Sequence, residues 1–299
     1  MKSSRAEKNN ASRKRLIYVA AAIVIILVPT VFSLQFFFGG QGIPKAAIID
    51  QLGSSRLAEA IRYENQTFLD AAKALLYKRF SVVDFYSANA SVEQYKQLAS
   101  AGYKLILWRA HSALDLNSNY IAISATDRYG TISYDQYLEN GQLTVCNITG
   151  YYYFGITPKF IEVMPGTFQD TVIVLMSCNG LKQGYLKTAQ AFEAKGAKVV
   201  ISWDDWVSSS DNDNGASLLL QHLIDENDTV SVAVNKIPEF PSVFGVARLH
   251  YDPQNPQVGN YRVPDYRQND GAKQGGLMVL TFVGRFKDHS KERSRNRVA

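Results

Sequence analysis

The chain has 299 residues, of which 46% are hydrophobic and 12% aromatic, and its formal net charge is +5. This length suits one well-buried globular domain with small additions. The basic residues are concentrated at the two ends of the chain, so the region between them is mildly acidic. Since nucleic-acid binding depends on positive charge on the folded surface, we expect no nucleic-acid partner.

A basic segment, residues 1–15, is followed by an uncharged apolar run, residues 16–38. As a helix this run is about 35 Å long, which is enough to span a bilayer. The positive-inside rule then places residues 1–15 in the cytoplasm and the rest of the chain outside. A cleaved signal peptide is the alternative, but its apolar region is normally shorter and ends in small residues, whereas this run ends in Phe36, Phe37 and Phe38. The sequence predicts a single-pass protein of the cell membrane with an extracytoplasmic domain.

Four Asn-x-Ser/Thr motifs, which are candidate glycosylation sites of an exported protein, follow the apolar run at Asn65, Asn89, Asn147 and Asn227. Such motifs also arise by chance in a chain rich in asparagine. They agree with the predicted topology without establishing it.

A short linker, residues 39–45, leads into an alternation of strands and helices within a domain at residues 46–286. We expect strands at residues 46–52, 81–86, 104–109, 171–177 and 197–203, and helices at residues 65–78, 91–100, 184–195 and 215–225. Strands that are apolar throughout and alternate with helices indicate an α/β fold, with a mostly parallel sheet covered by helices on both faces.

An insertion at about residues 112–170 interrupts this alternation with short β-like pieces at residues 120–124 and 142–146. It is rich in tyrosine, and the run Tyr151–Tyr153 belongs either to a packed insertion or, less favoured, to a substrate-binding surface. After Lys236 the prolines argue against regular structure until an apolar run at residues 277–283, which we interpret as an edge strand. The tail, residues 287–299, is charged and is predicted to be disordered.

Two residues with reactive side chains directly follow neighbouring predicted strands. His111 comes after the strand that ends at Arg109, and Cys178 comes after the next strand of the sheet. Ligands of parallel sheets bind at the carboxyl ends of the strands, so the imidazole and the thiol are expected at the same edge. A thiol nucleophile beside an imidazole that accepts its proton is the arrangement that cysteine catalysis requires.

The motifs Ala110-His111-Ser112 and Ser177-Cys178-Asn179-Gly180 resemble those of the caspase-like superfamily, which includes caspases, legumains, gingipains, clostripain and CHAT domains. In that family a histidine ends the third strand and a cysteine ends the fourth. The segment from Ala191 to Val234, with its Gly-Ala turn before an aliphatic strand that ends in Trp203, is also similar. The chain departs from the family pattern at the glycines that commonly flank the histidine, which are replaced here by Ala110 and Ser112.

The resemblance implies a cysteine endopeptidase without a cofactor, in which Cys178 is the nucleophile and His111 the general acid and base. The backbone amides of Ser112 and Cys178 would form the oxyanion hole. In the loop Trp203-Asp204-Asp205-Trp206, the residues Trp203, Asp204 and Asp205 would bind the substrate and favour a basic residue before the scissile bond of a peptide or protein. Trp203, Asp204 and Asp205 could equally have the structural role of capping the sheet end and the following helix.

Two alternatives stay open at the predicted site. Cys146 is the only other cysteine, so it either forms a disulfide with Cys178 or leaves Cys178 free to react. The domain is either an active peptidase or a catalytically inactive binding module on the same fold. The remaining histidines, His222, His250 and His289, lack the spacing of metal ligands, so no metal site is predicted.

Overall fold

The computed structural model describes residues 43–267. The predicted cytoplasmic segment, the predicted anchor at residues 16–38, most of the linker, the predicted strand at residues 277–283 and the tail lie outside the described residues. Within residues 43–267, no helix has both the length and the apolar character needed to cross a membrane.

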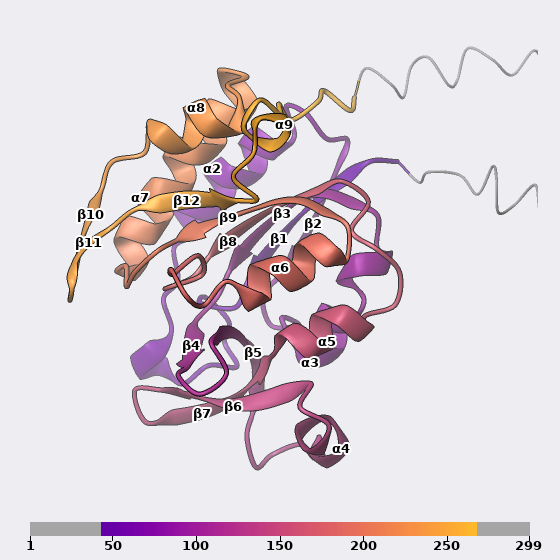
Figure 1. Ribbon diagram of the computed structural model, residues 1–299, viewed down its shortest axis with the longest axis vertical. Coiled ribbons are helices and arrows are strands. Elements are labelled where there is room, and N and C mark those ends of the chain that lie inside the picture. Colours follow the sequence, from indigo (N-terminus) through magenta and orange to yellow (C-terminus); the bar gives the residue numbers. More distant parts are fainter. Residues whose placement is uncertain (1–42, 268–299) are drawn as a thin grey trace, which may run out of the picture.

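A six-stranded sheet forms the centre of the fold, with the strand order β12-β9-β8-β3-β1-β2. Five strands run parallel to one another, and β12 pairs antiparallel with β9 at one edge (Figure 1). Their bounds are β1 Lys45–Asp50, β2 Val82–Tyr86, β3 Tyr103–Arg109, β8 Thr171–Met176, β9 Ala197–Trp203 and β12 Leu249–Asp252. The prediction of an α/β fold with a largely parallel sheet is confirmed.

Helices cover both faces of this sheet because its strands present apolar side chains to either side. On β1, for example, Ala46 and Ile48 enter one core and Ala47 and Ile49 enter the other, as the alternation of a strand requires. Figure 1 shows α2, α7 and α8 on one side and α3, α5 and α6 on the other. These helices span Gln66–Leu76, Ser209–Leu220 and Val230–Asn235 on the first face, and Val92–Lys96, Pro158–Val163 and Lys187–Ala194 on the second.

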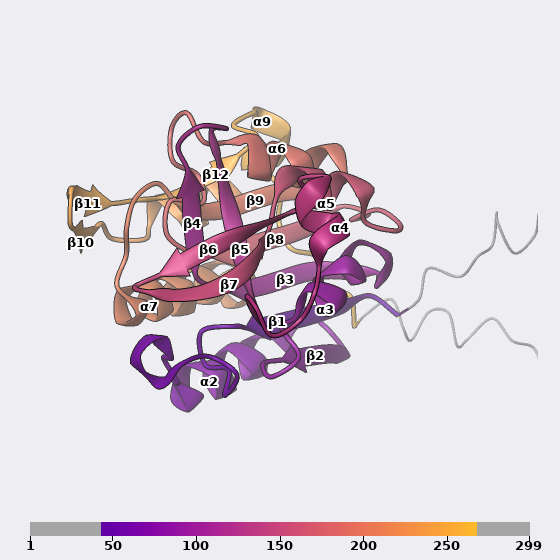
Figure 2. The same ribbon diagram turned by 90° about the horizontal axis from the view of Figure 1, so that it is seen from below.

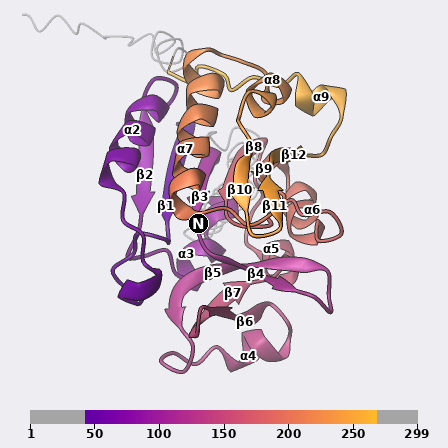
Figure 3. The same ribbon diagram turned by 90° about the vertical axis from the view of Figure 1, so that its left-hand side faces the viewer.

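The insertion forms a second, antiparallel sheet with the order β4-β5-β7-β6. Its elements are β4 Ser112–Asp115, β5 Tyr120–Arg128, α4 Asp135–Glu139, β6 Leu143–Ile148 and β7 Tyr151–Ile156. Figures 2 and 3 show this sheet beside the face of the central sheet that carries α3 and α5. Ile121, Ile123 and Phe154 join the core on that face, so the small sheet packs as an integral part of the domain.

The segment after Lys236 contains more regular structure than its prolines suggest. A hairpin of β10, Phe240–Ser242, and β11, Gly245–Ala247, projects from the domain (Figure 1) and is followed by β12 and by a short helix, α9, at Pro256–Gly259. β12 is four residues long and is completed by pairing with β9, far away in the chain. The sequence pattern missed it because this pairing is tertiary.

Candidate active site

His111 and Cys178 leave the sheet side by side. β3 and β8 are adjacent and parallel. The Ala110 amide, one residue beyond the end of β3, donates to the carbonyl oxygen of Met176, the last residue of β8, at 3.3 Å. His111 and Cys178 both line one cavity of about 400 Å³. The fold therefore brings the two predicted reactive residues to the wall of the same cavity.

The His111 ring is held in one tautomer. Its backbone amide donates to Gln51 Oε1 at 2.9 Å, and its Nε2 lies 2.9 Å from the Ile61 carbonyl oxygen. A carbonyl oxygen only accepts, so Nε2 carries the hydrogen and the neutral ring keeps a lone pair on Nδ1. Burial lowers the pKa of His111 below its usual value, and the charge of Arg109 lowers it further. The imidazole is consequently neutral near pH 7 and can accept a proton at Nδ1.

Cys178 carries a half-buried thiol, and its Sγ donates to the Val207 carbonyl oxygen at 3.5 Å. Burial raises the pKa of Cys178, and the nearby charge of Asp205 adds to this effect. Cys146 lies fully buried in the insertion, where burial raises its pKa to about 12. Both cysteines are free, so the structure contains no bridge between them.

Ser112 directs its backbone amide away from its own sheet. The Ser124 amide donates to the His111 carbonyl oxygen at 2.9 Å, which makes Ser112 and Ile123 a non-hydrogen-bonded pair of the antiparallel ladder. The Ser112 N–H thus points to the free edge of β4. On the side of Cys178, the Ser112 hydroxyl donates to the Cys178 carbonyl oxygen at 2.5 Å.

The turn that carries Cys178 packs tightly against β9. Asn179 adopts a φ of 59°, and its amide donates to the Asp205 carbonyl oxygen at 3.1 Å. Gly180 faces Ser202 so closely that a Cβ would overlap the Ser202 hydroxyl. This contact explains why the position after Asn179 needs a glycine.

Trp203, Asp204 and Asp205, the residues predicted to bind substrate, do not line the cavity. Trp203 is fully buried, and its Nε1 donates to Asn212 Oδ1 at 2.8 Å. Asp204 accepts from the Arg248 amide at 2.7 Å and lies 3.0 Å from His250 Nε2.

Asp205 Oδ1 accepts from the Trp206 amide at 2.9 Å and lies 3.6 Å from Lys182 Nζ. The aromatic wall of the cavity is instead formed by Trp206, whose side chain is 45% exposed.

The loop after β1 supplies much of the cavity, and sequence reasoning did not identify it. Leu52, Ala60, Arg62 and Tyr63 line the cavity together with Ile61, whose carbonyl oxygen orients His111. Every residue has a backbone carbonyl, so the sequence could not indicate that the one of Ile61 contacts His111. The one available signal was the polar pair Asp50-Gln51 directly after a buried strand.

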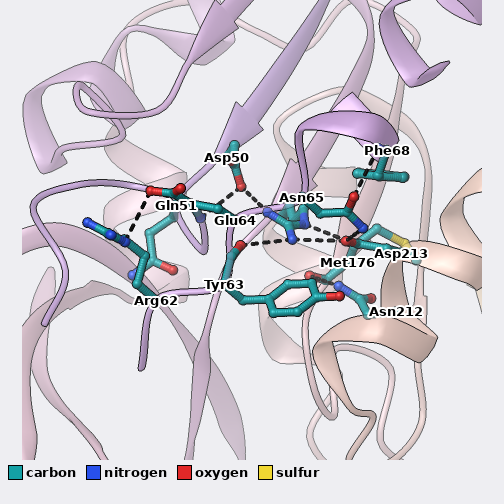
Figure 4. A network of polar contacts seen from close by, with 12 residues as sticks. Asp50, Gln51, Arg62, Tyr63, Glu64, Asn65, Phe68, Met176, Asn212 and Asp213 are labelled. Carbon is teal, nitrogen blue, oxygen red and sulfur yellow. Dashed lines mark hydrogen bonds and ion pairs between the residues drawn. The ribbon is translucent and has the colours of Figure 1, made fainter. Parts of the chain in front are cut away.

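A buried ionic cluster fixes both ends of this loop (Figure 4). Arg109, which is fully buried, donates to Asp213 from Nε at 2.6 Å and from Nη2 at 3.0 Å, and to Asp50 from Nη1. Its Nη2 also donates to the Tyr63 carbonyl oxygen at 3.1 Å, and Asp213 accepts from Asn65 Nδ2 at 2.8 Å. β1, β3, α7 and the start of α2 are therefore joined beneath the cavity.

The four candidate glycosylation sites differ in accessibility. Asn89, Asn147 and Asn227 are exposed. Asn65 is half-buried as the N-cap of α2, and its amide nitrogen, the atom that a glycan would modify, donates to Asp213. Folding thus makes Asn65 the least suitable acceptor of the four.

His222 has acidic neighbours in space although its spacing in the sequence predicted no metal site. Its Nδ1 lies 2.9 Å from Glu226 Oε2 and 3.1 Å from Asp228 Oδ2. Lys236 Nζ contacts the same two oxygens at 3.2 Å and 2.8 Å. Because the lysine ammonium contacts both carboxylates, the group is explained as an ion-pair network that ties α8 to the preceding turn.

Comparison with known proteins adds no assignment to this geometry: neither the protein-family models nor the curated protein sequences give a match.

Proposed function

We propose that this protein is a cysteine endopeptidase in which Cys178 is the nucleophile and His111 the general acid and base. The observation that carries the proposal is that the Cys178 thiol and the His111 imidazole line the same cavity. The Ile61 carbonyl oxygen accepts from Nε2 of that imidazole, which leaves Nδ1 free to accept a proton. The caspase-like resemblance of the motifs around these two residues supports the same assignment.

The pKa shifts favour a neutral pair at rest. Burial raises the pKa of the Cys178 thiol and lowers that of His111, so the proton stays on sulfur until a substrate binds. As Sγ attacks the substrate carbonyl carbon, His111 takes the thiol proton at Nδ1, and it then donates this proton to the leaving amine as the C–N bond breaks. Water hydrolyses the resulting thioester, with His111 accepting one proton from the water and returning a proton to Sγ, so no cofactor is required.

Two backbone amides are suited to stabilise the negative oxygen of the tetrahedral intermediate. The Ser112 N–H faces the free edge of β4, and the Ser112 side chain is bonded to the Cys178 residue itself. Together with the Cys178 amide it would form the oxyanion hole, an interaction that is typically worth about 3 kcal/mol per donor in the transition state.

The proposed setting of this activity is the outer face of the cell membrane, with residues 16–38 as the anchor. The support is the long uncharged run after a one-sided basic segment. Protease treatment of intact cells tests the orientation, because an extracytoplasmic domain should be digested without lysis. A domain that is digested only after lysis would show that it faces the cytoplasm.

A second candidate function, a catalytically inactive binding module, is favoured by one specific observation. The Cys178 thiol is half-buried, and burial raises its pKa against the opposing effect of the Val207 backbone, which reduces the supply of thiolate. In this case the cavity would bind a peptide segment without cleaving it.

Labelling of the full-length protein with a peptide-based, thiol-directed activity probe separates the two functions. The endopeptidase requires labelling at Cys178 that His111→Ala reduces at least about a hundredfold, the usual contribution of a general acid and base. His222→Ala is the matched control, since His222 is also half-buried but contacts Glu226 and Asp228 and does not line the cavity. In this variant, Cys178 should be labelled at the parental rate. Labelling that is insensitive to His111→Ala, or peptide hydrolysis by Cys178→Ala, would refute the assignment.

A further inference from the structure

Among residues 43–267, no carboxylate lines the cavity at His111 and Cys178, and Arg62 is the one residue of the lining with a permanent charge. The rest of the lining is apolar or uncharged: Leu52, Ala60, Ile61, Tyr63, Ala110, Ile148, Thr149, Met176, Ser177, Trp206, Val207, Ser208, Ser209 and Asn212, besides the reactive pair.

In the part of the chain that the structure describes, the aspartates next to the lining are all engaged with other groups. Asp211 Oδ2, for example, accepts from Ser208 Oγ at 2.7 Å. Asp50 and Asp213 are 2% exposed and bind Arg109 beneath the cavity floor. Asp205 is turned toward the Trp206 amide and Lys182, and Asp204 toward Arg248 and His250. An arginine or lysine of a substrate would therefore lose water without gaining an unpartnered carboxylate in the cavity wall, which disfavours its binding.

An acidic side chain is disfavoured by a different contact. Arg62 Nε lies 3.2 Å from Glu64 Oε1, so the guanidinium charge is already compensated at the rim. A substrate carboxylate would compete with Glu64 for it. The aliphatic part of Arg62 is what remains available to the cavity, as is common for long basic side chains.

The apolar part of the lining suits a large hydrophobic side chain. Met176, Ile148 and Leu52 are buried, while Trp206 stands 45% exposed over the same space. Contact with another apolar group would remove the exposed indole and the apolar lining from water, which favours the binding of that group.

We propose that this cavity accepts an uncharged apolar side chain, of the size of leucine or phenylalanine, from the residue whose carbonyl carbon Cys178 attacks. This inference rests on the proposed function for the identity of the attacked residue. It departs from the basic preference that the residues Trp203–Asp205 predicted, because those residues contribute nothing to the cavity wall.

A binding measurement tests the inference without requiring catalysis. The full-length Cys178→Ala protein is titrated by fluorescence anisotropy with labelled peptides that are identical except for one central residue: Leu, Phe, Arg, Lys or Asp. The Leu and Phe peptides are expected to bind at least about tenfold more tightly than the other three. Equal or tighter binding of the Arg, Lys or Asp peptide, or no binding of any peptide, would overturn the proposal.

A second variant changes the chemistry of the wall. Ser209 lines the cavity in the first turn of α7, where an aspartate is favourable to the helix, so Ser209→Asp should fold and raise the relative affinity for the Arg peptide severalfold. Asn214→Asp is the control, because Asn214 is an exposed residue of the same helix that lies outside the lining, so it should leave the relative affinities unchanged. An equal shift in both variants would contradict the assignment.

Hydrolysis by the parent protein is measured separately. Apolar selectivity in binding without hydrolysis by the parent would refute the endopeptidase and keep the cavity assignment. Hydrolysis with a basic or acidic preference would keep the endopeptidase and refute the cavity assignment.

Discussion

Replacement of Asp213 by asparagine should destabilise the domain more than the same change at Asp50. Asp213 accepts two hydrogen bonds from Arg109 and one from Asn65. Asparagine has the same shape, but one of its atoms becomes an NH₂ donor and would face another donor. Asp50 accepts one bond from Arg109 and one from the Gly53 amide at 3.0 Å.

The size of the effect follows from the charges of the cluster. Removing one partner of a buried ion pair costs 3–5 kcal/mol when the other charge is left alone. In Asp213→Asn, Arg109 keeps its contacts with Asp50 and the Tyr63 carbonyl oxygen, so we expect the lower end of this range, about 3 kcal/mol. Burial raises the pKa of Asp50 against the opposing effect of Arg109, so its negative charge contributes less to the cluster than its hydrogen bonds do. Asp50→Asn should accordingly cost only about 1 kcal/mol, the value of an ordinary hydrogen bond.

Urea unfolding of the full-length protein at pH 7, followed by tryptophan fluorescence, measures both changes. With an m value of about 3 kcal/mol/M, the midpoint should fall by about 1 M for Asp213→Asn and by about 0.3 M for Asp50→Asn. Equal midpoints for the two variants, or a greater loss for Asp50→Asn, would refute the reasoning that the two-bond contact with Asp213 anchors Arg109.

Two further predictions concern single side chains. Burial, together with hydrogen bonding to Asp252, raises the pKa of Glu193 to about 8. The folded protein therefore holds this proton more tightly than the unfolded chain does. The stability that the proton contributes is fully present below about pH 4.5 and is lost as the pH rises through 8. Glu193→Gln should therefore flatten the fall in melting temperature between pH 5 and pH 9, and an unchanged fall would count against the raised pKa. Ser112→Ala removes the bond to the Cys178 carbonyl and should cost about 1 kcal/mol in urea unfolding and slow probe labelling of Cys178. Ser112→Thr, which keeps the hydroxyl, should restore the labelling rate, and a rate unaffected by Ser112→Ala would exclude a positioning role.

Local patterns in the sequence were sufficient to predict the central sheet. β1, β2, β8 and β9 are each followed by a helix, whereas β3 leads into the insertion, and apolar strands that alternate with helices favour a mostly parallel sheet covered on both faces. The strand ends near Arg109 and Met176 are predicted within one residue, but the adjacency of β3 and β8 depends on the strand order of the sheet, in which β3 pairs with β1 and β8 and not with β2. A catalytic role for His111 and Cys178 remains a prediction.

Elements that depend on distant partners were not predictable in this way. The polar stretch Ser209–Asn214 reads as a loop, yet it forms the first half of α7, because Ser208 caps the helix and Asp213 binds the buried Arg109. Likewise β12 exists through its pairing with β9.

The chemistry of the cavity was decided by tertiary structure for the same reason. Asp204 and Asp205 supplied the right charge for a basic substrate, but in the fold they accept from the Arg248 and Trp206 amides, and neither lines the cavity. Residue identity determines which groups a chain possesses. Only packing determines which of them face a common space and which are neutralised elsewhere, since both depend on atoms far apart in the sequence.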